Sequence, residues 1–393
     1  MEPNFTGTKQ RVNKIVIAPD SYKGYLTAKQ AAAAMKQGCA DVFGQANYQL
    51  IPMADGGEGT VSTLVEANQG TLVETQVANP IGEIVSAQYG LIDNGRTAVI
   101  EMAAASCFQF INPKINRVGE ASTFGTGQLI EAALNQGVSK IILGLGGSAT
   151  NDGGAGMAVA LGAKLLDSSG ELIEMGGADL ARLAKIDITD FDMRLTEVEI
   201  IGATDVTNPL TGSQGATEVF GRQKGATEQQ VMQLDSALKR YAKVIYSDLG
   251  IDVDQIAGAG AAGGLGAGML AFLHAKLTSG IDLVMKETGF LQKIKGANIV
   301  LTGEGAIDFQ TQFGKAPSIV AQEAKAINPD CMVIGIGGKV GEDLGPLYHL
   351  GFDYIAPVTV DSHLGDPKIN AAKNLESTTA AIIRQLNERI ILF

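Results

Sequence analysis

The sequence predicts an α/β protein in which a doubly wound domain is interrupted by a second, mixed α/β domain. Short apolar runs alternate with helical patterns near both ends of the chain, which is typical of parallel strands joined by helices. The middle of the chain instead holds closely spaced strand patterns separated by turn signals, which favours antiparallel pairing. A length of 393 residues is also too great for one ordinary core.

The first part of the chain predicts two strands and two helices. Residues 14–18 form an apolar run that indicates the first strand. Thr27 is a suitable cap for the next helix, which we expect to end at Gly38. A second strand is expected at residues 48–52 and a second helix near residues 61–68.

The later elements continue these patterns. The closely spaced strands of the middle are expected at residues 71–77, 84–91 and 97–102. A strand–helix unit follows at residues 140–163 and another strand at 198–203. The last strands are expected at residues 298–302, 332–336 and 354–358.

These elements set the expected domains. Residues 14–70 and 291–393 would build the doubly wound domain, and residues 71–290 the inserted mixed domain. Residues 1–13 are polar and lack an apolar signal core, so they predict a flexible tail on a cytoplasmic protein. Residues 255–273 are uncharged, but their glycines dilute the hydropathy, and we expect a buried helix there rather than a membrane span.

Composition excludes several classes of function. The formal net charge of −12 repels nucleic acids and anionic membranes, so neither is expected as a partner. The cysteines and histidines are too scattered for a zinc site or a serine–histidine triad, and the thiols are expected to be free. These residues are Cys39, Cys107, Cys331, His274, His349 and His363.

Glycine is the unusual component. The chain holds 50 glycines, about twice the average share. They are clustered rather than periodic, which indicates several loops where the backbone must approach a ligand closely. In doubly wound sheets such loops bind ligands beyond the carboxyl ends of the strands.

The loop after the first strand, A-P-D-S-Y-K-G at residues 18–24, carries three polar candidates. Asp20, Ser21 and Lys23 precede a helix N-terminus, where anions are favoured. An ordinary turn could hold the same residues by chance. We favour a functional role because the loop ends a predicted strand.

The loop M-A-D-G-G-E-G-T at residues 53–60 places Asp55 and Glu58 among three glycines. Such a pair of carboxylates suits magnesium binding or proton transfer. The alternative is an acidic turn that caps the following helix.

The strongest local signal is G-L-G-G-S-A-T-N-D-G-G-A-G at residues 144–156. A strand, a glycine-rich loop with hydroxyl side chains and a helix together predict a phosphate cradle made of backbone N–H groups. The loop lacks the G-K-[ST] ending of Walker A and the spacing of a dinucleotide fingerprint. Its phosphate-binding candidates are Gly146, Gly147, Ser148, Ala149, Thr150, Asn151, Asp152, Gly153 and Gly154.

Three further loops lie at ends of strands or helices. They are S-T-F-G-T-G at residues 122–127, A-T-D-V-T-N-P-L at 203–210 and L-T-G-E-G-A-I-D at 301–308. Each taken singly is as compatible with a structural role as with function. Their candidate residues are Thr126, Asp205, Asn208, Gly303, Glu304 and Asp308, with the cation Lys315 shortly after the third loop.

Together these motifs resemble the bacterial glycerate kinase type-1 family. I-V-I-A-P-D-S-Y-K-G, P-M-A-D-G-G-E-G-T, G-T-G-Q-L-I, G-L-G-G-S-A-T-N-D-G-G-A-G, D-V-T-N-P-L, G-A-G-A-A-G-G-L-G-A-G and T-G-E-G-A-I-D occur in that family's order. The resemblance implies a flavodoxin-like domain interrupted by a second α/β domain. It also implies transfer of a phosphoryl group from ATP to D-glycerate, with the 2-phosphate as the usual product, in a cleft between the two domains.

Phosphoryl transfer depends mainly on positioning and charge stabilisation, and we assign roles on that basis. Asp205 is the preferred base, and Asp20, Lys23 and Lys315 complete the catalytic candidates. Substrate contacts are expected from Ser21, Asp55, Asn208 and Thr126. The 146–154 loop, Gly303 and Glu304 would hold ATP, and Asp55 and Glu58 would hold Mg²⁺.

Two alternatives stay open. The glycine loop has a superficial likeness to the G-L-G-S-S-A loop of the galactokinase–homoserine kinase superfamily, although that fold would not begin with a doubly wound strand. The first alternative is therefore another small-molecule kinase, including one for another hydroxy acid or sugar acid. The second alternative is a nonenzymatic ligand-binding protein on the same scaffold. The sequence leaves open a homo-oligomer, the nucleotide preference and the hydroxyl that is attacked.

Overall fold

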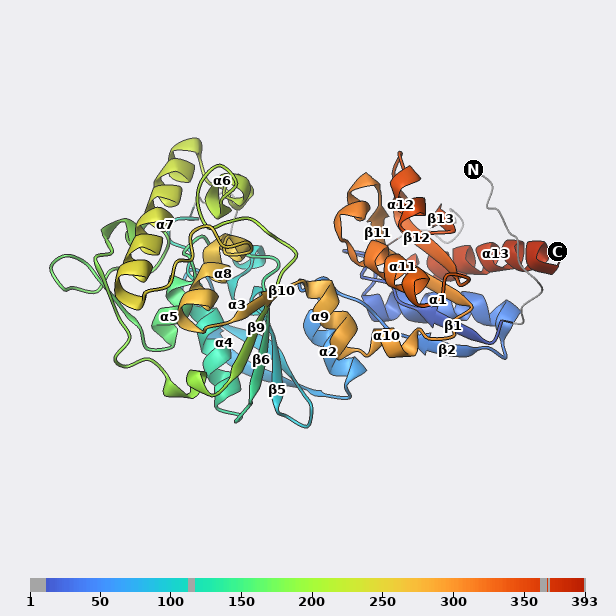
Figure 1. Ribbon diagram of the computed structural model, residues 1–393, viewed down its shortest axis with the longest axis horizontal. Coiled ribbons are helices and arrows are strands. Elements are labelled where there is room, and N and C mark those ends of the chain that lie inside the picture. The colour runs from blue at the N-terminus through green and yellow to red at the C-terminus, as the bar shows by residue number, and fades with distance from the viewer. Residues whose placement is uncertain (1–11, 112–116, 361–365, 367, 392–393) are drawn as a thin grey trace. The chain divides into compact units, whose positions relative to one another are not determined.

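The computed structural model of the chain describes residues 12–111, 117–360, 366 and 368–391 (Figure 1). Most of the predicted tail, and His363, lie outside the described residues. The chain forms two compact units, Met1–Asp55 with Val284–Phe393 and Gly56–Leu283, and each is considered by itself. None of the helices in the described ranges is long and apolar enough to cross a membrane.

The first unit contains a parallel sheet in the strand order β13-β12-β11-β1-β2. Numbered along the chain within this unit, the order is 2-1-3-4-5, which is the flavodoxin-like order that the sequence analysis expected. The order reverses between β1 and β11, where such sheets bind ligands. The strands are β1 (Lys14–Ile17), β2 (Asn47–Leu50), β11 (Ile299–Ile307), β12 (Met332–Val340) and β13 (Tyr354–Pro357).

Helices cover this sheet because its central strands, β1, β11 and β12, are largely apolar and buried on both faces. Ile15 and Ile17 of β1 share a core cluster with Met35 of α1 (Ala28–Phe43) and Ile383 of α13 (Ala371–Ile391). The helix α11 (Ala316–Ile327) packs on β11 and β12. The connection from β1 to β2 through α1 and the connection from β11 to β12 through α11 run in opposite directions across the sheet. Because such connections are right-handed, α1 and α11 lie on opposite faces.

Gly38 does not end α1, contrary to the sequence expectation. Thr27 caps the helix with a capping box as predicted, but the helix continues to Phe43. A Cβ at Gly38 would lie 2.4 Å from the carbonyl oxygen of Glu376 and 2.8 Å from Cβ of Thr379, both in α13. The glycine therefore allows two helices to approach closely, a contact that the local sequence cannot reveal.

The second unit contains a mixed sheet in the strand order β10-β9-β6-β5-β4-β3. The pairs β3–β4 and β4–β5 are antiparallel, as predicted for the middle of the chain, and the remaining pairs are parallel. The strands are β3 (Thr71–Ala78), β4 (Ile84–Ile92), β5 (Thr97–Glu101), β6 (Lys140–Gly144), β9 (Glu199–Ala203) and β10 (Lys276–Thr278). The short pair β7 (Lys164–Leu166) and β8 (Lys185–Asp187) was not expected.

Helices lie on both faces of this sheet as well. Tyr89 donates a hydrogen bond to the carbonyl of Ala132 in α4 (Phe124–Leu134). A Cβ on the next residue, Gly90, would touch Val65 of α2 (Thr60–Ala67). Adjacent strand residues point to opposite faces, so α2 and α4 cover opposite sides of β4. Because α2 packs on β4 and β5, it belongs to this unit; the predicted domain boundaries near residues 70 and 290 stay predictions.

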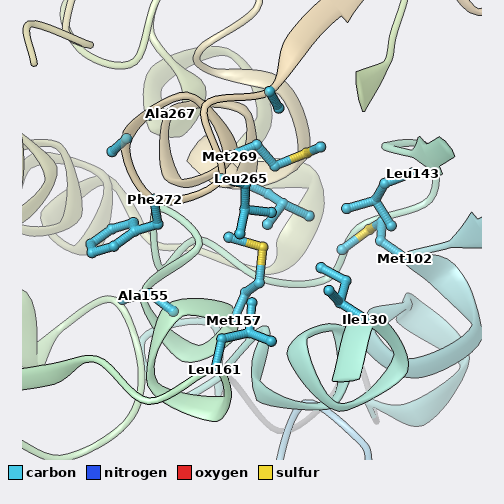
Figure 2. Packing of buried hydrophobic residues seen from close by; sticks show 14 of the residues in the cluster. Met102, Ile130, Leu143, Ala155, Met157, Leu161, Leu265, Ala267, Met269 and Phe272 are labelled. Carbon is cyan, nitrogen blue, oxygen red and sulfur yellow. The ribbon is translucent and has the colours of Figure 1, made fainter. Parts of the chain in front are cut away.

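The helix after the glycine loop is short and held on two sides. Met157 of α5 (Ala155–Ala160) lies between Ile130 of α4 and Leu265 of α8 (Ala261–Phe272) (Figure 2). A Cβ at Gly268 of α8 would lie 2.9 Å from Cα of Gly154, so small residues let α8 approach the glycine loop. Ala262, Gly263 and Gly264 adopt left-handed backbone angles, and the regular helix follows them to Phe272. The glycine-rich stretch is thus an irregular entry into a buried helix, as predicted.

The remaining helices complete the two units. They are α3 (Ala103–Ser106), α6 (Ala216–Phe220), α7 (Glu228–Leu249), α9 (Gly280–Glu287), α10 (Phe290–Lys293), α12 (Gly345–His349) and the 3-10 helices η1 (Phe108–Phe110), η2 (Asp179–Arg182), η3 (Met193–Thr196), η4 (Arg222–Lys224) and η5 (Phe309–Phe313).

Candidate functional site

Asp20 lies at the point of the first sheet where the strand order reverses. It follows β1, and its backbone N–H donates to the carbonyl of Gly303 in β11 at 2.8 Å. Burial raises the pKa of the Asp20 carboxyl to about 7, and the negative charges of Asp55 and Glu304 act in the same direction. The backbone N–H of Ser21 and the charge of Lys23 oppose them. Asp20 can therefore exchange a proton near neutral pH.

Glu304 lies inside β11 rather than in a loop after it, so the expected strand end at residue 302 was wrong. The strand continues to Ile307 because it pairs with β12 as far as Val340. Gly303 suits this pairing, since a Cβ there would lie 2.1 Å from the carbonyl oxygen of Ile336 and would displace Tyr22.

Lys315 is already paired with carboxylates. Its Nζ lies 3.4 Å from Oε1 of Glu304 and 3.9 Å from Oδ1 of Asp308. Burial raises the pKa of Glu304, and the attraction of Lys315 and a hydrogen bond from Thr311 oppose that shift. The first unit thus brings Asp20, Asp55, Glu304 and Lys315 to one region, although Glu304 lies within β11 and Lys315 at the start of α11 rather than at strand ends.

Asp55 and Glu58 are both exposed, and they are described in different units. Among the described residues, no cluster of three Cys, His, Asp or Glu side chains is arranged to hold a metal ion. Mg²⁺ commonly binds through one or two carboxylates together with substrate phosphates. The exposed carboxylate of Asp55 fits that kind of site, and magnesium stays a prediction.

Glu101 holds the start of α2, a role that the sequence analysis missed. Its Oε1 accepts hydrogen bonds from the N–H groups of Gly59 at 3.0 Å and Val61 at 2.8 Å. Burial raises the pKa of this carboxyl, the two N–H groups lower it, and Glu58 adds to the increase. A carboxylate from β5 therefore fills the anion position at this helix N-terminus.

The glycine loop after β6 has two parts, and the first part is open. Gly146 is partly exposed, Gly147 is exposed and adopts φ +75°, and Ser148, which forms an isolated bridge with Cys107, is buried. Within the described residues, the backbone N–H groups of Gly146, Gly147 and Ser148 donate no hydrogen bond to the protein. Successive unpaired N–H groups around a left-handed residue form a concave anion site, so this part fits the predicted phosphate cradle.

The second part of the loop is buried. Both oxygens of Asp152 are occupied by protein donors: N–H and Oγ1 of Thr123, each at 2.8 Å, N–H of Gly156 at 3.1 Å and N–H of Gly154 at 3.2 Å. Asn151 is fully buried and donates to Oγ1 of Thr217 at 2.8 Å. These two side chains shape the loop from inside.

The last glycines of the loop serve packing. A Cβ at Gly153 would lie 2.6 Å from the ring of Tyr241, and one at Gly154 would lie 3.0 Å from Cα of Gly268. Their absent side chains make room for α7 and α8. Their predicted contacts with phosphate gain no support from these positions.

Asp205 and Asn208 follow β9, as expected, in a loop tied to neighbouring backbone. Oδ1 of Asp205 accepts the N–H of Gly280, the first residue of α9, at 3.0 Å, and Asp205 is an exposed residue. Nδ2 of Asn208 donates to the carbonyl of Gln214 at 2.8 Å.

Comparisons with known proteins decide the family. The model of the glycerate kinase family matches residues 15–387 of the chain. The chain belongs to the glycerate kinase family. This confirms the family that the motifs indicated and, with it, the prediction that the chain is an enzyme.

Relatives cover almost the whole chain. A glycerate kinase of Halalkalibacterium halodurans is 49% identical over 87% of this chain and 90% of its own length. A glycerate 2-kinase of Escherichia coli K12 is 45% identical over 94% of this chain and 99% of its own. The crystal structure of a glycerate kinase 2 candidate from Salmonella typhimurium LT2 is 46% identical, with a TM-score of 0.86 over 96% of this chain and 99% of that one.

Two further residues, Thr126 and Lys224, lie in the second unit and bear on the candidate site. Oγ1 of Thr126 is fully buried against Oγ of Ser106 at 2.8 Å, so its predicted contact with substrate gains no support. Lys224 was missed by the sequence analysis. Its Nζ donates to the carbonyl of Thr150 at 2.6 Å, although the two residues lie 74 positions apart in the sequence.

Proposed function

We propose that the chain transfers the γ-phosphoryl group of ATP to D-glycerate, giving ADP and 2-phosphoglycerate. The observation that carries this proposal is the open glycine loop at the end of β6, in a chain that matches the glycerate kinase family almost throughout. The relative named glycerate 2-kinase, 45% identical over 94% of this chain, supports the 2-phosphate as product.

The proposed roles follow the chemistry of phosphoryl transfer. The N–H groups of Gly146, Gly147 and Ser148 bind phosphate oxygens, and Lys23 and Lys315 neutralise the charge that develops on the transferred group. When Mg²⁺ is bound, Asp55 and Glu58 are the carboxylates that would hold it. The ion would neutralise phosphate oxygens.

We further propose Asp20 as the base, in place of Asp205. A base is most effective when its pKa lies near the working pH, and the pKa of Asp20 is about 7. Its carboxylate accepts the proton of the glycerate hydroxyl while that oxygen attacks the γ-phosphorus and ADP leaves. The exposed carboxylate of Asp205 instead binds the first N–H group of α9.

A coupled assay tests the reaction. ADP should be released when both ATP and D-glycerate are present, and NMR of the product should show phosphate on the 2-hydroxyl. Phosphate on the 3-hydroxyl would contradict the regiochemistry alone. If another hydroxy acid reacts faster than D-glycerate, that acid replaces D-glycerate as the proposed substrate. The expected cleft between the domains, the cytoplasmic location and a homo-oligomer stay predictions.

A further inference from the structure

Lys224 contacts the glycine loop from a separate segment of the second unit. It is the last residue of η4, and its side chain is partly buried. Nζ donates to the carbonyl of Thr150 at 2.6 Å and to Oγ of Ser148 at 3.3 Å. Ser148 is also one of the residues whose backbone N–H has no acceptor among the described residues. A cation therefore lies beside the open amides of the loop.

Among the described residues, the charge of Lys224 is not balanced by a direct ion pair. None of the ion pairs of the described residues joins Lys224 to a carboxylate, whereas Lys315 has two such partners. The neighbouring Arg222 is engaged by Glu218 and Glu228. A phosphate bound beside Lys224 would therefore displace no carboxylate partner among these ion pairs.

The charged group that faces Lys224 from the loop is Asp152. Burial lowers the pKa of Lys224 to about 7, and the charge of Asp152 opposes that shift. Asp152 is itself occupied by donors from Thr123, Gly154 and Gly156. Near neutral pH a part of the Lys224 population is therefore neutral.

We propose that Lys224 binds a phosphate group of the nucleotide together with the N–H groups of Gly146, Gly147 and Ser148, and that this binding is coupled to uptake of a proton by Lys224. The proposal rests on the proposed function in one respect, which is that ATP supplies the phosphate. A nearby anion favours the charged form of an amine. Binding above neutral pH therefore converts –NH₂ to –NH₃⁺, and the proton comes from the buffer.

The competing explanation is that Lys224 only braces the loop through the carbonyl of Thr150. Calorimetry distinguishes the two. The full chain is titrated with ATP at pH 8, without glycerate, in two buffers of different ionisation enthalpy, so that the difference in heat gives the protons taken up. The wild type should take up more protons than Lys224→Arg, by up to about one per ATP, because arginine stays charged at this pH. Lys224→Met should bind ATP about 10- to 100-fold more weakly.

The controls keep the result decisive. Lys243→Met removes an exposed positive charge from α7 and should leave ATP affinity and proton uptake unchanged. Each variant's melting temperature shows whether it is folded. Equal proton uptake by the wild type and Lys224→Arg, or unchanged ATP affinity in folded Lys224→Met, would overturn the proposal. Wild type that binds ATP with this uptake but does not phosphorylate D-glycerate would instead overturn the proposed function.

Discussion

Asp20 and Asp55 form a pair of carboxylates at the end of the first sheet. Burial, followed by the negative charge of Asp55, raises the pKa of Asp20 to about 7. A pKa of about 7 is unusual for an aspartate. An exposed aspartate has a much lower pKa and is therefore charged throughout the neutral range. The pair therefore gives the chain a group that can accept a proton from an alcohol at neutral pH.

Replacing Asp20 tests this role directly. Asp20→Asn keeps the size of the side chain but cannot accept a proton, so kcat should fall by about 10²-fold or more. Asp205→Asn is the matched comparison and should lower kcat by less than about tenfold. Steady-state kinetics with D-glycerate measure both. The reverse order of effects would assign the base to Asp205, as the sequence analysis had expected.

The pH profile tests the interaction of the two carboxylates. In its proposed role as the base, Asp20 must be ionised, so kcat/KM should rise with pH through about 7. Asp55→Asn removes a charge that raises the pKa of Asp20, and the rising limb should move to lower pH. A limb that keeps its position in Asp55→Asn would show that Asp20 does not govern the profile.

Gly38→Ala tests the contact between α1 and α13. The added Cβ would meet the carbonyl oxygen of Glu376, a backbone atom that cannot move aside. We expect a loss of about 1–3 kcal/mol in the free energy of unfolding, measured by denaturant titration. Gly345→Ala is the control, since nothing lies within 4 Å of its Cβ position, and it should change stability by less than about 0.5 kcal/mol. Equal effects would contradict the close approach.

Glu101→Ala tests the anchoring of α2. The substitution leaves the N–H groups of Gly59 and Val61 without their acceptor. We expect a loss of about 1–2 kcal/mol in the free energy of unfolding, with amide hydrogen exchange that increases first at residues 59–61. Exposed Glu66, near the other end of the helix, provides a comparison through Glu66→Ala. Unchanged exchange at Gly59 and Val61 would rule out the cap.

Local patterns predicted much of the fold and some of the site. The capping box at Thr27, the antiparallel middle strands and the glycine loop after β6 each have a signal within a few residues. The sequence also singled out Asp20 and Glu304, although it misplaced Glu304 after the strand rather than within it. The two residues lie together in the first unit because β1 and β11 are neighbours.

Contacts between distant segments could not be predicted in this way. Lys224 contacts Thr150, which lies 74 positions earlier in the sequence. Glu101 contacts the start of α2, although the strands β3 and β4 separate the two along the chain. The sequence predicted that Gly38 ends α1, but its lack of a side chain instead allows α13 to pack closely against α1. In the glycine loop, sequence alone could not separate the open amides from the buried side chains of Asn151 and Asp152.

The most direct test of the account is ADP release by the purified full chain, with Asp20→Asn as the inactive reference. The wild type should release ADP in proportion to added D-glycerate and little without it, and the product should carry phosphate on the 2-hydroxyl. Release that is independent of D-glycerate, or equal in the wild type and Asp20→Asn, would contradict the account.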